Sequence, residues 1–114
     1  MKYTVSIKNN YEFRRTYNKG KSAATSRIVL YLRPNRLETN RLGLTVSNKI
    51  GKAVCRNKIR RRLKEIYRLS EDKLNKGYDV ILVARHKARY AEYSELRRDF
   101  TWLCAKLGLL GEKQ

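Results

Sequence analysis

Apolar residues recur at helical spacing between residues 53 and 70. Cys55, Ile59, Leu63 and Ile66 are three or four positions apart, so they fall within one narrow stripe of an α-helix. Most of the positions between them are arginine or lysine. The pattern predicts a long helix that packs by its stripe and presents a broad basic surface.

Two further helices are predicted, one at each end of the chain. In "YSELRRDFTWLCAKLG", Ser94 can cap the start and Gly108 the end. In the shorter "NNYEFRRTYNKGKS", Asn9 or Asn10 can cap the start and Gly20 can end the helix. The C-terminal segment repeats its apolar residues at helical spacing, at Leu96, Phe100, Leu103 and Leu107.

Three segments have the patterns of β-strands. In "SRIVLYL" and the residue after it, Ile28, Leu30 and Leu32 point one way, whereas Tyr31 and Arg33 point the other. The segment "RLGLTVS" alternates in the same manner and has one half-polar face. The segment "GYDVILVAR" is apolar on both faces, which predicts the most buried strand.

Together these segments predict a single domain over residues 1–114, of the α/β (α+β) class, in the order α-β-β-α-β-α. A short extra turn is predicted near "HKARYAEY". Helices on one side of a small sheet would make a two-layer α-β sandwich with one open sheet face. A ligand can lie on such a face.

The charge of the chain narrows the class of partner. Twenty-eight lysines and arginines oppose ten acidic residues, for a formal net charge of +18. This excess favours a polyanion, either nucleic acid or an anionic membrane. No run approaches the roughly 18 apolar residues of a membrane span, and the N-terminal segment lacks a signal-peptide core. We therefore expect a cytoplasmic protein without a membrane partner, in which Cys55 and Cys104 stay reduced.

The basic residues concentrate in one segment. Residues 39–64 contain nine lysines and arginines and no acid. A solvated helix face is the usual explanation of a charge run, but such a face mixes both signs. Arginine and lysine gain affinity for RNA by releasing counterions from its phosphates, and Asn57 adds an amide donor and acceptor near the helix start. The segment therefore predicts a contact with the RNA backbone.

The sequence does not favour a self-sufficient enzyme. The only histidine, His86, is flanked by Arg85 and Lys87 and has no identifiable acidic partner, which favours a surface position. Carboxylates are scattered, and P-loop, dinucleotide-binding and zinc-ligand patterns are missing from the sequence. We predict neither catalytic nor metal-binding residues in the chain.

Three aromatic residues are candidates for base stacking. Phe13 and Tyr17 are four residues apart and share one helix face. Core packing is the alternative for all three residues, and composition favours it for Phe13 taken alone. Tyr31 differs, because it points away from the apolar face of its strand. An aromatic ring on an open sheet face beside cations can stack on single-stranded bases.

The segment "RNKIRRRLKE", preceded by "GLTVSNKIGKAVC", resembles the signature of the bacterial ribonuclease P protein family. The segments "EFRRTYNKGKS", "IVLYLR" and "GYDVILVAR" extend the resemblance over nearly the whole chain. The resemblance implies an α-β sandwich with a left-handed β-α-β crossover. It also implies a non-catalytic protein subunit of an endoribonuclease, which binds a catalytic RNA and the 5′ leader of precursor tRNA. The RNA and its Mg²⁺ ions would perform the hydrolysis that leaves the mature 5′ end.

The resemblance also implies two groups of site residues. Phe13, Tyr17, Tyr31 and Arg33 fall in the cleft for the leader, between the open sheet face and the first helix. Tyr17 stands where phenylalanine is common, and lysine replaces a frequent arginine at two positions of the basic helix. The predicted RNA-binding residues of that helix are Arg56, Asn57, Lys58, Arg60, Arg61, Arg62, Lys64 and Arg68.

Two other functions remain alternatives from the sequence. A ribosomal or general RNA-binding protein without a part in catalysis would carry the same basic helix. A DNA-coating protein fits less well, because an open sheet with aromatic residues suits unstacked strands better than a duplex.

Overall fold

The computed structural model describes residues 1–111 of the chain. Its sheet has five strands in the order β1-β4-β5-β3-β2. The elements follow the chain as β1 (Thr4–Ser6), α1 (Asn10–Lys19), β2 (Lys21–Ala24), β3 (Ile28–Pro34), β4 (Asn40–Thr45), α2 (Ala53–Ser70), β5 (Tyr78–Ala84) and α3 (Tyr93–Leu107), with short 3-10 turns at Glu71–Lys73 and His86–Tyr90.

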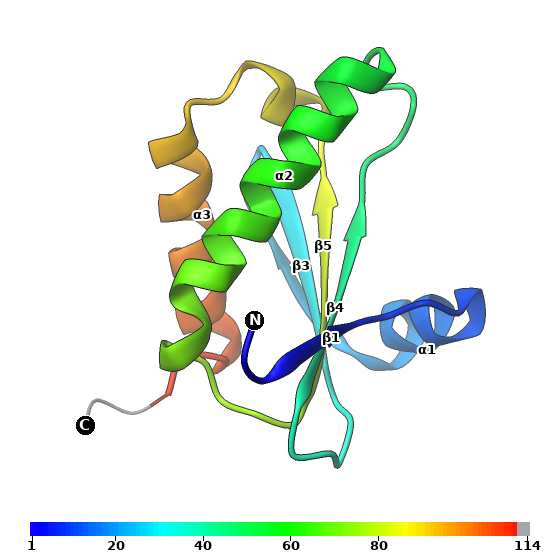
Figure 1. Ribbon diagram of the computed structural model, residues 1–114, viewed down its shortest axis with the longest axis vertical. Coiled ribbons are helices and arrows are strands. Elements are labelled where there is room, and N and C mark those ends of the chain that lie inside the picture. The colour runs from blue at the N-terminus through cyan, green and yellow to red at the C-terminus, as the bar shows by residue number, and fades with distance from the viewer. Residues whose placement is uncertain (112–114) are drawn as a thin grey trace.

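The helices lie on both sides of the sheet. α2 and α3 cover one face, and α1 lies against the other (Figure 1). The expectation of helices on one side therefore holds for α2 and α3 but is wrong for α1. The sheet face opposite α2 carries apolar residues such as Ile81, which is fully buried. A short helix that packs there is stabilised because it removes this apolar surface from water. The open face is thus a cleft bounded by α1.

The predicted mixed α/β fold class is confirmed, and the strand order adds two elements that were not predicted. β1 pairs in parallel with β4, and β2 pairs antiparallel with β3. Both are short strands at the edges of the sheet, with mostly exposed residues. They lack the alternation of a half-buried strand, because backbone pairing rather than side-chain burial holds them. The order is therefore β-α-β-β-β-α-β-α.

The connection from β4 through α2 to β5 is left-handed. β4 and β5 are parallel neighbours. In Figure 1, the β1 edge of the sheet is nearest the viewer, both strands point upward, and α2 lies to their left. The chain therefore turns counter-clockwise while it moves away from the viewer, from β4 to the more distant β5. This connection is left-handed, whereas nearly all β-α-β units are right-handed.

The helix ends follow the sequence in part. Gly108 ends α3 in the left-handed conformation with φ 81°, as a C-terminal glycine does. Gly20 ends α1 for a different reason, since a Cβ there would lie 2.7 Å from the carbonyl oxygens of Thr16 and Leu32. Ser94 does not cap α3, because the helix starts at Tyr93 and Ser94 is its second residue. Glu92 takes the N-cap and exchanges hydrogen bonds with Glu95.

The hydrophobic core lies between the sheet and the helices α2 and α3. Ile59, Leu63 and Ile66 of the predicted stripe are buried, whereas Cys55 at its start is only half-buried. β5 lies at the centre of the sheet, as its continuous apolar run predicted. Cys104 is also in the core, where burial raises the pKa of its thiol to about 12. No helix within residues 1–111 is long and apolar enough to cross a membrane.

A buried carboxylate holds the N-terminal strand in place. Glu71 accepts hydrogen bonds from the backbone N–H groups of Lys2 at 2.8 Å and Tyr3 at 3.0 Å. Burial acts to raise the pKa of Glu71, but these bonds and one from Thr4 outweigh it and hold the pKa below its ordinary value. β1 therefore depends on the charged form of one side chain.

Truncation of Leu63 will test the core. Leu63 is fully buried on α2, so Leu63→Ala should lower the free energy of unfolding by about 2–5 kcal/mol. Leu69, on the same helix and 58% exposed, is the matched control, and Leu69→Ala should change little. Denaturant unfolding of both variants measures the difference, and equal losses would contradict this core.

The variant Glu71→Gln will test the attachment of β1. At neutral pH the free energy of unfolding of the variant should be lower by about 1–3 kcal/mol, which is the contribution of hydrogen bonds to a charged group. The folded pKa is lowered, so the stabilisation is present above the ordinary value of 4.5 and is lost as the pH falls through the folded value. Unfolding free energies should therefore converge for wild type and variant in acid. A constant gap across this pH range would contradict the role of the charge.

Candidate RNA-binding surface

Three aromatic rings form a cluster on the open face of the sheet. The rings of Tyr17 and Tyr31 meet edge to face, with centroids 4.8 Å apart, and Phe13 follows at 6.3 Å from Tyr17. All three side chains are half-buried. Phe13, Tyr17 and Thr45 also line a hollow of about 340 Å³ beside α1. The cluster therefore has one side packed on the sheet and another side open to a ligand.

A glycine in β4 makes room for the first of these rings. A Cβ at Gly43 would lie 2.6 Å and 2.7 Å from two ring atoms of Phe13. The ring thus lies directly on the backbone of β4. The hydroxyl of Tyr17 forms a hydrogen bond of 3.0 Å with the hydroxyl of Thr45 on the same strand. β4 therefore fixes the positions of two of the three rings.

A charged network joins α1 to the sheet next to these rings. Arg41 of β4 donates two hydrogen bonds of 2.8 Å to Asp79 of β5, and it also donates to Glu12 of α1. Asp79 is 1% exposed and also accepts a bond of 3.0 Å from Asn35. The hydrogen bond to Asp79 is the main reason that the pKa of Arg41 is raised. Glu12 precedes Phe13, so the network helps to position the aromatic cluster.

Spacing along the chain does not indicate this network. Arg41 is the first residue of "RLGLTVS" and lies on its half-polar face, but its partners are distant in sequence. Asp79 carried the stronger signal, because an acid at the start of the most apolar strand needs a buried partner. Arg33 lies 4.0 Å from the same carboxylate, more distant than Arg41, and stays half-buried at the border of the cleft.

The predicted residues of the basic helix divide into two groups. Three of the eight have partners outside the group: Arg56 donates to the carbonyl of Gly51 at 2.8 Å, Arg62 donates to the carbonyl of Ala91 at 3.2 Å, and Arg68 pairs with Glu65 at 2.7 Å. Within residues 1–111, Arg68 is the only cation of the group in an ion pair, and the cations without one are Arg56, Lys58, Arg60, Arg61, Arg62 and Lys64. The side chain of Asn57 accepts a hydrogen bond of 3.1 Å from Arg60.

A groove of about 630 Å³ brings parts of both predicted groups together. Phe13 lines it from the open face, and Arg60, Arg61 and Lys64 line it from α2. Edge strand β1 and the centre of β4 complete the walls. Tyr31 and Arg33 do not line this groove. The groove therefore brings the basic side of α2 to one ring of the aromatic cluster, Phe13, which also lines the hollow beside Tyr17.

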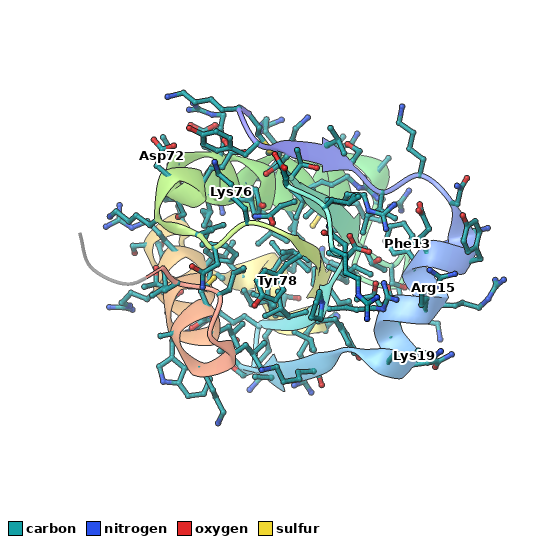
Figure 2. The ribbon with its side chains drawn as sticks, turned by 90° about the horizontal axis from the view of Figure 1, so that it is seen from below. Phe13, Arg15, Lys19, Asp72, Lys76 and Tyr78 are labelled. Carbon is teal, nitrogen blue, oxygen red and sulfur yellow. The ribbon has the colours of Figure 1, made fainter. Side chains whose placement is uncertain are left out.

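Basic side chains also lie at both ends of the molecule. Figure 2 shows Phe13, Arg15 and Lys19 along α1 at one end of the molecule, and Lys76 and Asp72 at the other. The ammonium of Lys76 lies 3.8 Å from the ring centroid of Tyr3. The ring therefore faces one of the cations at the end opposite α1.

Comparison with known proteins identifies the family. The family model described as Ribonuclease P matches residues 1–108. The chain belongs to the ribonuclease P protein family. A ribonuclease P protein component from Natranaerobius thermophilus is 43% identical over 110 residues, which cover 96% of each chain. The corresponding protein of Caldanaerobacter subterraneus is 44% identical and matches over 96% of this chain and 95% of its own.

Solved structures of ribonuclease P proteins have the same fold. The Staphylococcus aureus protein superposes with a TM-score of 0.86 at 31% identity, covering 93% of this chain and 97% of its own. The Thermotoga maritima protein gives a TM-score of 0.78 at 28% identity, covering 84% and 91%. The two unpredicted edge strands are therefore part of a fold that the chain shares with ribonuclease P proteins.

The variant Gly43→Ala will test whether β4 positions Phe13. The added methyl group would overlap the ring, so we expect a loss of about 1–3 kcal/mol in stability and a displaced ring. Affinity for a single-stranded RNA oligonucleotide should fall in parallel. Combining it with Phe13→Leu, which leaves room for the methyl group, should recover stability but not RNA affinity. If the double variant is no more stable than Gly43→Ala, the overlap is not the cause.

Proposed function

We propose that this chain is the protein subunit of ribonuclease P and removes 5′ leaders from precursor tRNA together with a catalytic RNA. The observation that carries the proposal is the groove in which the open-face aromatic ring of Phe13 meets Arg60, Arg61 and Lys64, cations that form no ion pair within residues 1–111. The family assignment supports the same function.

The cations of α2 and the aromatic cluster of the open face suit two different RNA ligands. The cations of α2 neutralise phosphates of a folded RNA and release counterions, which makes this contact dependent on salt. Phe13, Tyr17 and Tyr31 offer ring surfaces to unstacked bases, as a leader presents them. The protein thereby holds the catalytic RNA and the precursor on one surface and reduces their mutual repulsion.

The hydrolysis itself is assigned to the RNA subunit. Glu12 and Asp79, the carboxylates of the open face, are both bonded to Arg41. Within residues 1–111, no group of three or more histidine, cysteine or acidic side chains lies together in a way that could hold a metal ion. Both carboxylates are thus engaged by an arginine, and we expect Mg²⁺ at the holoenzyme active site to be held mainly by the RNA. The chain's own part is to bind, orient and screen charge.

The variant Tyr31→Ala will test the leader cleft. Loss of one stacked base costs on the order of 1–3 kcal/mol, so the affinity of the protein–RNA complex for precursor tRNA should fall about tenfold. Affinity for mature tRNA, which lacks a leader, should hardly change. Tyr31→Phe keeps the ring and should retain most of the affinity.

Equal losses for precursor and mature tRNA would contradict a leader cleft. In that case Tyr31 would act on the protein fold or on a contact common to both RNAs. The unfolding free energy of Tyr31→Ala, measured alongside, separates these two outcomes.

A further inference from the structure

The outward flank of α3 carries the only tryptophan of the chain between two cations. Trp102 is 51% exposed, and Arg98 and Lys106 lie four residues before and after it. Residues four apart share one side of a helix and follow each other by about 6 Å along its axis. The ammonium of Lys106 lies 4.9 Å from the indole centroid. The flank is therefore an exposed row of cation, aromatic ring and cation.

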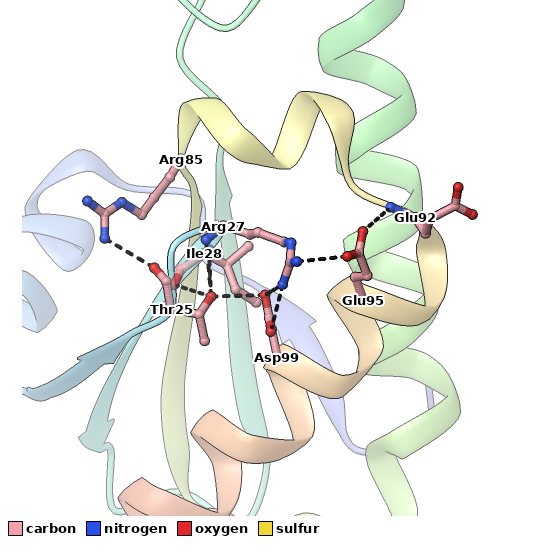
Figure 3. A network of polar contacts seen from close by, with 7 residues as sticks. All are labelled: Thr25, Arg27, Ile28, Arg85, Glu92, Glu95 and Asp99. Carbon is pink, nitrogen blue, oxygen red and sulfur yellow. Dashed lines mark hydrogen bonds and ion pairs between the residues drawn. The ribbon is translucent and has the colours of Figure 1, made fainter.

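Arg27 prevents the acids of α3 from neutralising this row. Its guanidinium bonds to Asp99 at 3.1 Å and to Glu95 at 2.8 Å, and the hydroxyl of Thr25 also donates to Asp99 (Figure 3). Within the described part of the chain, no ion pair involves Arg97, Arg98 or Lys106. The positive charge of the flank is thus available to a ligand.

The same bonds show which way the row faces. Thr25 and Arg27 lie in the turn between β2 and β3, so Glu95 and Asp99 point toward that edge of the sheet. Trp102 follows Asp99 by three residues and leaves the helix on the same flank. A hollow of about 630 Å³ lies at this place, lined by Arg97, Arg98, Asp99, Thr101 and Trp102.

Edge strand β2 separates this row from the aromatic cluster of the open face. Ser22 of β2 pairs in register with Tyr31, one strand spacing of about 4.8 Å farther out. The exposed residues of β2 are small or basic, and they are Lys21, Ser22 and Ala24. A single strand of RNA that passes Tyr31 can therefore cross β2 itself without meeting an acid, and the acids beyond β2, Glu95 and Asp99, are paired with Arg27.

We propose that Arg98, Trp102 and Lys106 form a second single-strand site, which binds distal nucleotides of a long 5′ leader. The proposal rests on the proposed function of the open face. An exposed indole stacks on any base, and flanking cations bind the phosphates. The occupant is the leader rather than the RNA subunit, because the row faces the β2 edge. The groove of the basic helix opens at β1, the opposite edge of the sheet.

The test uses precursor tRNAs whose leaders are lengthened one nucleotide at a time, bound to the complex of this protein with its RNA subunit. Wild type should gain affinity in two steps, the second after the leader has passed the open face. Trp102→Ala should remove the second step, on the order of tenfold, and leave the first unchanged. Trp102→Phe should keep most of it.

The single tryptophan gives a direct readout on the wild-type protein. Its fluorescence should change when a long-leader precursor binds but not when a short-leader precursor binds. Leu69→Ala, which truncates an exposed apolar residue on α2, is the matched control and should retain both steps.

Three results would overturn the distal site: equal losses at every leader length, a wild type without a second step, or weaker binding of the RNA subunit alone in Trp102→Ala. Cleavage of the shortest-leader precursor separates this site from the proposed function. If wild type does not stimulate that cleavage, the proposed function fails. If it does, and affinity rises in the first step but not in a second, only the α3 site fails.

Discussion

The pairing of a few carboxylates with particular arginines is the interaction on which the rest of this structure depends. The chain has a net charge of +18, and four of its acids hold two arginines at the places where α1 and α3 meet the sheet. Glu12 and Asp79 hold Arg41, and Glu95 and Asp99 hold Arg27. These two networks fix α1 and α3 on opposite faces of the sheet. Most cations of the basic helix form no ion pair within residues 1–111, and we propose that RNA binds them.

This division explains how a self-repelling chain can stay folded. The pairs lie where a helix meets the sheet and are partly buried, so their opposite charges attract more strongly than they would in water. The exposed cations of α2, such as Lys58, Arg61 and Lys64, lie in water, where salt screens their repulsion. Binding to RNA then replaces small counterions by phosphates. Folding stability therefore depends on the arginines that are paired with acids, whereas the proposed RNA binding depends on other lysines and arginines of the chain.

Much of the fold could be predicted because helical and strand periodicities report burial. The stripe of α2 and the alternating faces of β3 are read in this way, and Tyr31 was placed on the correct face. Strands β1 and β2 could not be found, because backbone pairing at an edge leaves little side-chain pattern. The Arg41–Asp79 pair joins two strands that are distant in sequence, so no local spacing could reveal it. The grouping of Phe13 with the cations of α2 likewise depends on tertiary structure.

Cleavage of 5′-labelled precursor tRNA by the cognate RNA subunit at low Mg²⁺, with and without this protein, is the most direct test of a subunit that binds and screens but does not catalyse. We expect the protein to stimulate cleavage at the mature 5′ boundary, because its cations reduce the need for magnesium in holding two RNAs together. The protein alone should cleave nothing. RNA binding without stimulation would contradict the proposed function and favour a general RNA-binding protein.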